Sequence, residues 1–558
     1  MMPYSARTVA LYGIDLGTTF ASVAVADRGV ARMVPLEDRG VTLATAVLLD
    51  GTVPGSPSAT VGRRAVAQWR ERCGSGGGAP AGLALVRGSK SHLGVEHAVA
   101  GGPPWPLDGI ELRATDLGAL VLRSLRAWID RTPGLPPLDG VVVTHPQRLR
   151  NRERRAVAQS VALADLRCAA LLPEPDAAAW AYGMGPRFAG RSARFMVFDF
   201  GGGTLDVTIL RRTGGAQPSL EAMASYGAQL GGLGVDERVR EHLVDRYRSA
   251  AGVSGVTLAD LDEASREGLL AAAEGIKIQL NRHASDDANP AVRVASRTVA
   301  LRTVTGDGLP SAALRVSLGE FARWTDDVTA RAASCADEAL HRAGLRWGDL
   351  DEVLLVGGSS WLHPVQVRLR EACGAVPVRL FDDDADPLNP ACAVAAGAAL
   401  YAEHLARDAS VTSYQGVIPD ALGVRAREPD PDRPGARRDT LAVLVPPLTR
   451  VPFEGRRTFR KRGGATTLPI EVLEGSSLAD ATPLGRFDIT LDEGLADGAP
   501  VEVVLRIARD GIFSLALHDP ATQRTRTVSL RDARGLYADD ELEARRTWLC
   551  ALRLDPGG

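Results

Sequence analysis

The sequence predicts an α/β protein in which a duplicated, two-lobed domain is followed by an antiparallel β domain. Three observations lead to this prediction. Residues 195–210 run as an apolar strand, a glycine turn and an alternating strand, and residues 11–25 repeat the same design. Beyond residue 417, several short segments have the composition of strands in a half-buried sheet. Two similar hairpins in one chain indicate an internal duplication, so we expect two lobes whose turns face each other.

The second hairpin has the chemistry of a phosphate site. Its turn contains Gly201, Gly202 and Gly203, whose backbone N–H groups can converge on an anion. Asp199 and Asp206 flank the turn, where they can face a hydrated metal ion. A Walker loop and a dinucleotide fingerprint would each place their glycines before a helix, whereas an alternating strand follows these glycines. The pattern therefore predicts a hairpin that binds phosphate and magnesium.

Length and composition bound the possible functions. At 558 residues the chain is too long for one core, so we expect two or three domains. The net charge of -3 gives no basic field for nucleic acid, and apolar runs such as Val394–Leu400 are too short to span a bilayer. Residues 1–8 lack the pattern of a secretory signal, so we expect a cytoplasmic location. Six scattered cysteines without a Cys-x-x-Cys pair argue against disulfides and zinc. We expect neither a nucleic-acid nor a membrane partner.

The two hairpins also carry a family resemblance. Gly13–Thr19 and Asp199–Thr204 resemble the phosphate loops of the 70-kDa heat-shock (DnaK-type) chaperones, members of the actin and sugar-kinase superfamily. The resemblance implies an actin-like (ribonuclease H-like) ATPase that binds ATP or ADP with Mg²⁺. A linker, a peptide-binding β-sandwich, and a short C-terminal helix and tail would follow. These four parts would span residues 8–408, 409–416, 417–530 and 531–558, in that order.

A residue-by-residue match to the family's motifs implies an ATPase site. Lys90 matches the lysine that reaches the terminal phosphate and the attacking water, and Glu174 takes the place of a signature glutamate. From its position alone, Glu174 is as consistent with a carboxylate that starts a helix. The implied catalytic residues are Lys90, Glu174, Asp199 and Thr204, and the implied metal ligands are Asp15, Asp199 and Asp206. The implied nucleotide contacts are Gly17, Thr18, Thr19, Phe20, Gly201, Gly202, Gly203, Gly231, Gly232, Glu274, Lys277, Asn281, Gly357, Gly358, Ser359 and Trp361.

Lysine usage supports two of these assignments. Of the 65 basic residues, three are lysine: Lys90, Lys277 and Lys461. In an arginine-rich chain, a retained lysine indicates a place where a compact ammonium fits beside a phosphate and a planar guanidinium does not. Lys90 and Lys277 fall on the family's two lysine positions, a coincidence of about one in seven hundred for random placement among basic sites. Glu274 and Lys277 are three positions apart, and the other interpretation of this spacing is an ordinary exposed ion pair on a helix. The retained lysine disfavours that interpretation.

Several positions depart from the family's pattern. Ala170 stands where an arginine usually helps to dock J-domain partners, and Trp361 replaces an arginine that stacks on adenine. The linker residues 411–415 are polar rather than leucine-rich, which weakens the expected coupling between the domains. For a C-terminal helix only Tyr537–Leu554 remains, so we expect the family's long helical lid to be absent.

The resemblance implies a DnaK-type chaperone that hydrolyses ATP to control its binding of unfolded or extended polypeptide. Its implied partners are such clients, a nucleotide exchange factor and, with Ala170 weighing against it, a J-domain co-chaperone. The polar linker and the missing lid favour an alternative, a nucleotide-gated regulatory or interaction protein of the same fold that does not cycle on peptides. A small-molecule kinase would share the hairpins but would leave the β domain and residues 173–183 unexplained.

Overall fold

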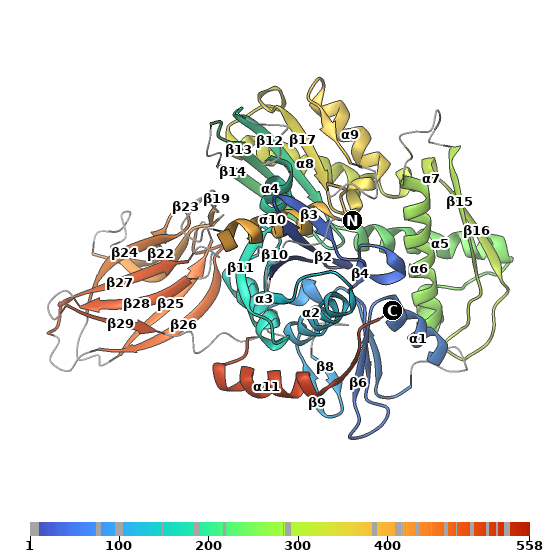
Figure 1. Cartoon of the computed structure of the whole chain (residues 1–558), viewed down its shortest axis with the longest axis horizontal. Coiled ribbons are helices and arrows are strands. Elements are labelled where there is room, and N and C mark those ends of the chain that lie inside the picture. Colours follow the sequence, from blue (N-terminus) through green and yellow to red (C-terminus); the bar gives the residue numbers. More distant parts are fainter. Residues whose placement is uncertain are drawn as a thin grey trace.

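The computed structural model shows a mixed α/β body with a separate β domain beside it (Figure 1). It describes residues 10–557 except 74–79, 95–103, 148, 184–189, 216–218, 283, 285–288, 290–291, 382–387, 408–413, 416, 419, 430–432, 434, 448, 462–466, 476, 492–495, 509–512, 520–522 and 529–535. Within these residues, no helix combines the length and the apolar character needed to cross a membrane.

The first hairpin lies in a six-stranded sheet. Its strands are β1 (Ala10–Leu16), β2 (Phe20–Asp27), β3 (Val30–Met33), β4 (Leu43–Ala44), β10 (Leu138–His145) and β11 (Cys168–Pro173). β2 pairs antiparallel with both β1 and β3, whereas β1 pairs in parallel with β10, and β10 with β11. The glycine turn between β1 and β2 therefore opens at the carboxyl end of the parallel strands.

The second hairpin lies in a six-stranded sheet, five of whose strands repeat the order and direction of β11-β10-β1-β2-β3. Its strands are β12 (Ala193–Phe200), β13 (Leu205–Arg212), β14 (Leu220–Ala228), β17 (Glu352–Val356), β18 (Val378–Arg379) and β19 (Tyr414–Gln415). β13 pairs antiparallel with β12 and β14, whereas β12 pairs in parallel with β17, and β17 with β18. Each sheet thus presents a glycine turn at the corresponding strand end.

Two alanine-rich helices join the two sheets. Side chains of α4 (Glu174–Gly183) and α10 (Ala393–Arg407) share one apolar cluster with residues of β10, β12 and β17. The fit is close, because a Cβ added at Gly397 would lie 1.7 Å from the carbonyl oxygen of Ala177. Small side chains therefore allow the helices to approach each other and fix the spacing between the sheets.

The other helices and small sheets surround this centre. The helices are α1 (Arg63–Cys73), α2 (Ala114–Arg131), α3 (Asn151–Leu163), α5 (Gly232–Ala251), α6 (Glu263–Asn281), α7 (Leu318–Trp324), α8 (Asp326–Ala343), α9 (His363–Cys373) and α11 (Asp539–Ala551). The strands are β5 (Val47–Asp50), β6 (Ser58–Val61), β7 (Leu83–Val86), β8 (Trp105–Leu107), β9 (Ile110–Leu112), β15 (Val294–Val299), β16 (Ala312–Ser317) and β30 (Arg553–Asp555). The capping box at Ser317 predicts one helix to about Gly344, but the chain bends at Thr325, whose ψ is 14° and whose hydroxyl donates to the carbonyl of Phe321.

The β domain is an antiparallel sandwich. Its strands are β20 (Val417–Ile418), β21 (Leu422–Pro429), β22 (Arg437–Val445), β23 (Thr449–Arg450), β24 (Phe453–Arg460), β25 (Thr467–Glu474), β26 (Thr482–Thr490), β27 (Pro500–Ile507), β28 (Phe513–Asp519) and β29 (Arg524–Val528). Eight of them form two four-stranded sheets in the orders β22-β21-β25-β26 and β24-β27-β28-β29, and β20 pairs with β23 in a separate two-stranded sheet. One apolar cluster contains side chains of both sheets, so the sheets pack face to face.

The segments before and after the sandwich both form β-strands, where the sequence predicted a linker and a C-terminal helix with a tail. Most of the predicted linker 409–416 lies outside the described residues, but Tyr414–Gln415 pairs in parallel with β14. At the other end, α11 packs on α3, and three residues that we expected to be helical or unstructured form β30, which pairs with β6. A three-residue strand has no periodicity to detect, so the sequence carried no signal for it.

Arginines at the start of α3 contact the sandwich. The guanidinium of Arg150 donates to the hydroxyl of Thr482, and that of Arg155 donates to the carbonyl of Phe513 at 2.8 Å. Beside them, the Glu474 side chain is 3% exposed, and no donor among the described residues reaches its Oε2 atom. Burial raises the pKa of Glu474 to about 7, and Arg154 opposes that shift. The interface therefore holds a carboxyl group that titrates near neutrality.

We expect the free energy of unfolding to fall as the pH rises toward the folded-state pKa of Glu474. Glu474 holds its proton more firmly in the folded state, so its contribution is complete below the unfolded pKa of about 4.3 and is lost as pH approaches about 7. Asp420 and Glu153 reinforce the shift, whereas Arg150 weakens it. The full effect on the free energy of unfolding is at most about 4 kcal/mol.

Urea unfolding at pH 5 and pH 8 measures this effect. Glu474→Gln should reduce the difference in the free energy of unfolding between the two pH values. Glu471→Gln, which removes a more exposed carboxylate of the same strand paired with Arg425, should leave this difference unchanged. Equal pH dependence in wild type and Glu474→Gln would contradict the assignment.

Candidate active site

A cavity of about 550 Å³ contains most of the predicted site residues. Side chains and turns from both hairpins, α4, α6 and the loop after β17 line it. The predicted residues in its lining are Asp15, Gly17, Thr18, Thr19, Phe20, Lys90, Glu174, Asp199, Gly201, Gly202, Thr204, Gly232, Glu274, Lys277, Asn281, Gly357, Gly358, Ser359 and Trp361. Gly203, Gly231 and Asp206 lie outside the lining. Residues up to 346 positions apart in sequence are thus brought to one space.

The two glycine turns approach each other closely across one end of this cavity. A Cβ at Gly202 would lie 1.9 Å from the Thr19 hydroxyl, and one at Gly231 would lie 2.4 Å from the Gly202 carbonyl. These positions therefore have no room for a side chain. Gly203 and Gly231 support the turns in this way without lining the cavity themselves.

Four charged side chains meet beside the turns. The ammonium of Lys90 donates to Glu174 Oε1 at 2.5 Å, with both side chains at most 10% exposed. Burial raises the pKa of Asp15 to about 7, and Glu174 adds to the shift while Lys90 opposes it. Burial also raises the pKa of Asp199 well above its usual value, with Glu174, Asp15 and Asp206 adding to it. The site therefore concentrates negative charge that a cation would neutralise.

The donor set fits a hydrated magnesium ion. Among the described residues, no donor reaches the buried Oδ2 of Asp199, so an acceptor is available there. Within the same residues, no group of three or more His, Cys, Asp or Glu side chains could hold a metal directly. The carboxylates of Asp15 and Asp199 suit Mg²⁺, which is usually bound through one or two carboxylates and keeps several waters. Asp206 pairs with Asp199 across the hairpin and is 1% exposed, so it acts on the charge of Asp199 rather than lining the cavity.

Another wall of the cavity is formed by α6 and the loop after β17. Lys277 donates to Asp236 at 2.7 Å, and the amide oxygen of Asn281 accepts the backbone N–H of His363 at 3.0 Å. The guanidinium of Arg282 lies 5.8 Å from the Trp361 ring centroid. A planar ring and a guanidinium at one wall can stack on a base.

Sequence reasoning missed two of these residues. Along the chain, Asp236 is the acidic residue nearest to the predicted nucleotide contacts Gly231 and Gly232. Arg282 directly follows Asn281, and it returns an arginine to the wall where Trp361 has replaced one. Both residues could have been found by inspecting the charged residues that lie next to the predicted nucleotide contacts in the sequence.

Comparisons with known proteins agree with this geometry. A model of the family described as Hsp70 protein matches residues 85–547, which is most of the chain. The chain belongs to the Hsp70 family. It is also similar to the chaperone protein DnaK of Elusimicrobium minutum, with 26% identity over 545 residues that cover 96% of this chain and 79% of the relative. Hsp70 membership implies an actin-like ATPase with a β-sandwich, and the mixed α/β sheets and the sandwich described above are consistent with it.

A second cavity of about 250 Å³ adjoins the first one beside Lys90. It shares Thr18, Lys90 and Thr204 with the first cavity and also contacts Pro146 and Arg150. Because Arg150 also contacts Thr482 of the sandwich, this space connects the predicted phosphate end with the domain interface.

Proposed function

We propose that this Hsp70 protein binds ATP with Mg²⁺ between two duplicated actin-like lobes and hydrolyses it. The observation that carries the proposal is the cluster of Lys90, Glu174, Asp15 and Asp199 beside the two facing glycine turns. The repeated order of strands in the two sheets supports the duplication. Hsp70 proteins are generally ATPases, and every predicted catalytic residue lines one cavity here.

The proposed chemistry is positioning and charge stabilisation. Backbone N–H groups of the turns and the hydroxyls of Thr18, Thr19 and Thr204 would hold the phosphates. Mg²⁺ held through its waters by Asp15 and Asp199 would neutralise charge on the phosphate oxygens. Glu174 orients the Lys90 ammonium and can accept a hydrogen bond from the attacking water.

We further propose that the β-sandwich binds unfolded or extended polypeptide under control of the nucleotide, as DnaK-type chaperones do. An exchange factor would be a partner, whereas Ala170 weighs against docking of a J-domain co-chaperone. A cytoplasmic location belongs to the same proposal.

One alternative has a specific observation behind it. A nucleotide-gated regulatory or interaction protein of this fold needs no cycle of peptide capture and release. Helix α11 lies on α3 rather than over the sandwich, and the described part of the linker pairs with β14 through two residues. No comparable observation favours a small-molecule kinase.

We expect weak coupling between ATP and peptide. Coupling equals the difference in free energy between two domain arrangements, and a short, polar docked segment supplies little of it. Release of a fluorescent apolar peptide should therefore be fast with ADP and should change by less than about tenfold when ATP replaces it. Stopped-flow release and the ATPase rate at saturating peptide measure this. A change of several orders of magnitude would show that the polar linker transmits the signal.

A further inference from the structure

The C-terminal segment returns to the part of the molecule that carries the first hairpin. Helix α11 lies against α3 and, in the view of Figure 1, below α2. Leu549 is fully buried and Leu552 is 6% exposed, and both belong to the apolar cluster that contains Leu117 and Val121 of α2. The core of this lobe therefore includes side chains from both ends of the chain.

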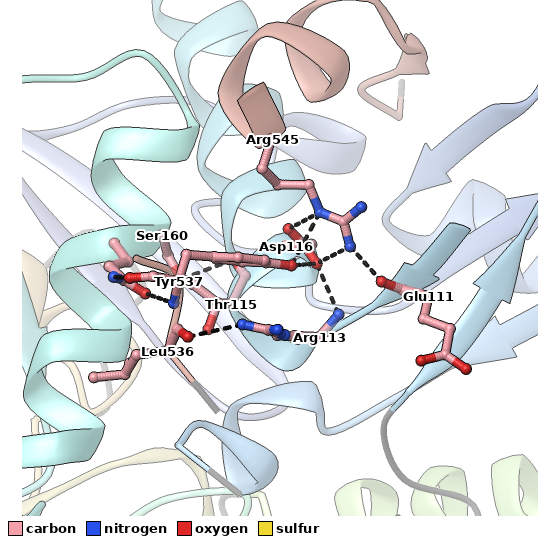
Figure 2. A network of polar contacts seen from close by, with 9 residues as sticks. Glu111, Arg113, Thr115, Asp116, Ser160, Leu536, Tyr537 and Arg545 are labelled. Atoms are coloured by element: carbon pink, nitrogen blue, oxygen red, sulfur yellow. Dashed lines mark hydrogen bonds and ion pairs between the residues drawn. The ribbon is translucent and has the colours of Figure 1, made fainter. Parts of the chain in front are cut away.

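A buried ion pair fixes the start of the segment. Asp116 of α2 is fully buried, and its carboxylate accepts from Arg545 Nε at 3.0 Å and from the Tyr537 hydroxyl at 2.6 Å (Figure 2). The Arg113 guanidinium lies 4.1 Å from the Tyr537 ring centroid. Gln159 of α3 donates to the Tyr537 carbonyl at 2.7 Å and accepts its N–H at 3.0 Å. A buried carboxylate with a paired guanidinium specifies one position of the segment, because either charge left alone would be costly.

The end of the segment completes a sheet. β30 pairs in parallel with β6, in the order β30-β6-β5-β7. Ser124 and Trp128 of α2 donate to the Pro556 carbonyl at 2.6 and 3.1 Å. β7 leads directly to the turn that carries Lys90. The last residues therefore support the small sheet from which the predicted catalytic lysine extends.

We propose that residues 536–557 are a clasp, a docking segment whose partner is the surface formed by α2, α3 and β6 of its own chain. The ATPase domain is then discontinuous, and the sandwich is an insertion anchored to it on both sides rather than a terminal domain on one linker. The clasp neither covers the sandwich nor depends on the nucleotide. This inference stands whether or not the cavity hydrolyses ATP.

Cleavage of the full-length protein between the sandwich and the clasp tests the proposal. A protease site placed within residues 529–535 allows the purified chain to be cut after folding. We expect the clasp to co-elute with the rest of the cut chain in size-exclusion chromatography, with or without ATP. Its separation from the wild-type body directly after cleavage would overturn the proposal.

Matched variants distinguish specific docking from general adhesion. Arg545→Ala should speed dissociation of the cut clasp at least about tenfold, whereas Arg546→Ala, which removes a neighbouring half-exposed arginine, should not. A labelled synthetic peptide of residues 536–558 should bind the cut Arg545→Ala chain in place of the weakened clasp, and the Arg545→Ala peptide should not. Equal retention of the Arg545→Ala and Arg546→Ala clasps, or equal binding of the two peptides, would refute the proposal.

Discussion

Lys90→Arg is expected to bind ATP with near wild-type affinity and to hydrolyse it far more slowly. The Lys90 side chain is 7% exposed and paired with Glu174, so a broader, planar guanidinium cannot occupy its place without displacing the carboxylate. Loss of a charge aimed at the transition state costs about 2–4 kcal/mol, which corresponds to a rate roughly 30- to 1,000-fold lower. Single-turnover hydrolysis measures the chemical step apart from nucleotide binding.

Lys461→Arg is the matched control, because it makes the same exchange outside the cavity lining. It should leave the single-turnover rate unchanged. A wild-type rate in Lys90→Arg would remove Lys90 from the catalytic group.

Asp199→Asn is expected to lose most of the dependence on magnesium. The Asp199 side chain lines the cavity with a buried oxygen that no described donor reaches, and an amide in its place removes the negative charge that attracts a hard cation. ATP titrations with and without Mg²⁺ should differ clearly in wild type and little in the variant, and turnover should fall.

Asp130→Asn, which changes an exposed carboxylate on α2, should behave as wild type. If Asp199→Asn keeps both the magnesium dependence and the turnover of the wild type, the hairpin at Gly201 has a structural role only.

Local chemistry explains what the sequence could predict. The Asp-x-Gly turns of both hairpins carry their predicted function within a few residues, so their positions could be found without the rest of the fold. Lys90 and Glu174 are 84 positions apart, and their ion pair followed from the family resemblance rather than from any spacing in this chain.

Long-range pairing explains what the sequence could not predict. β30 is three residues long and pairs with a strand nearly 500 positions earlier. Neither its residue pattern nor the adjacent sequence therefore predicts a strand. Arg545 resembles any surface arginine of an amphipathic helix until Asp116 is placed beneath it. The buried state of Glu474 likewise depends on docking of the sandwich on α3, which no local pattern encodes.

Single-turnover hydrolysis of γ-labelled ATP by the wild-type protein, with and without Mg²⁺, tests the central claim most directly. The proposed site predicts that bound ATP is converted to ADP and phosphate in a magnesium-dependent reaction far faster than in solution. Recovery of intact ATP from a magnesium-loaded, nucleotide-bound protein would contradict catalysis at this cavity and would favour a nucleotide-gated binding protein.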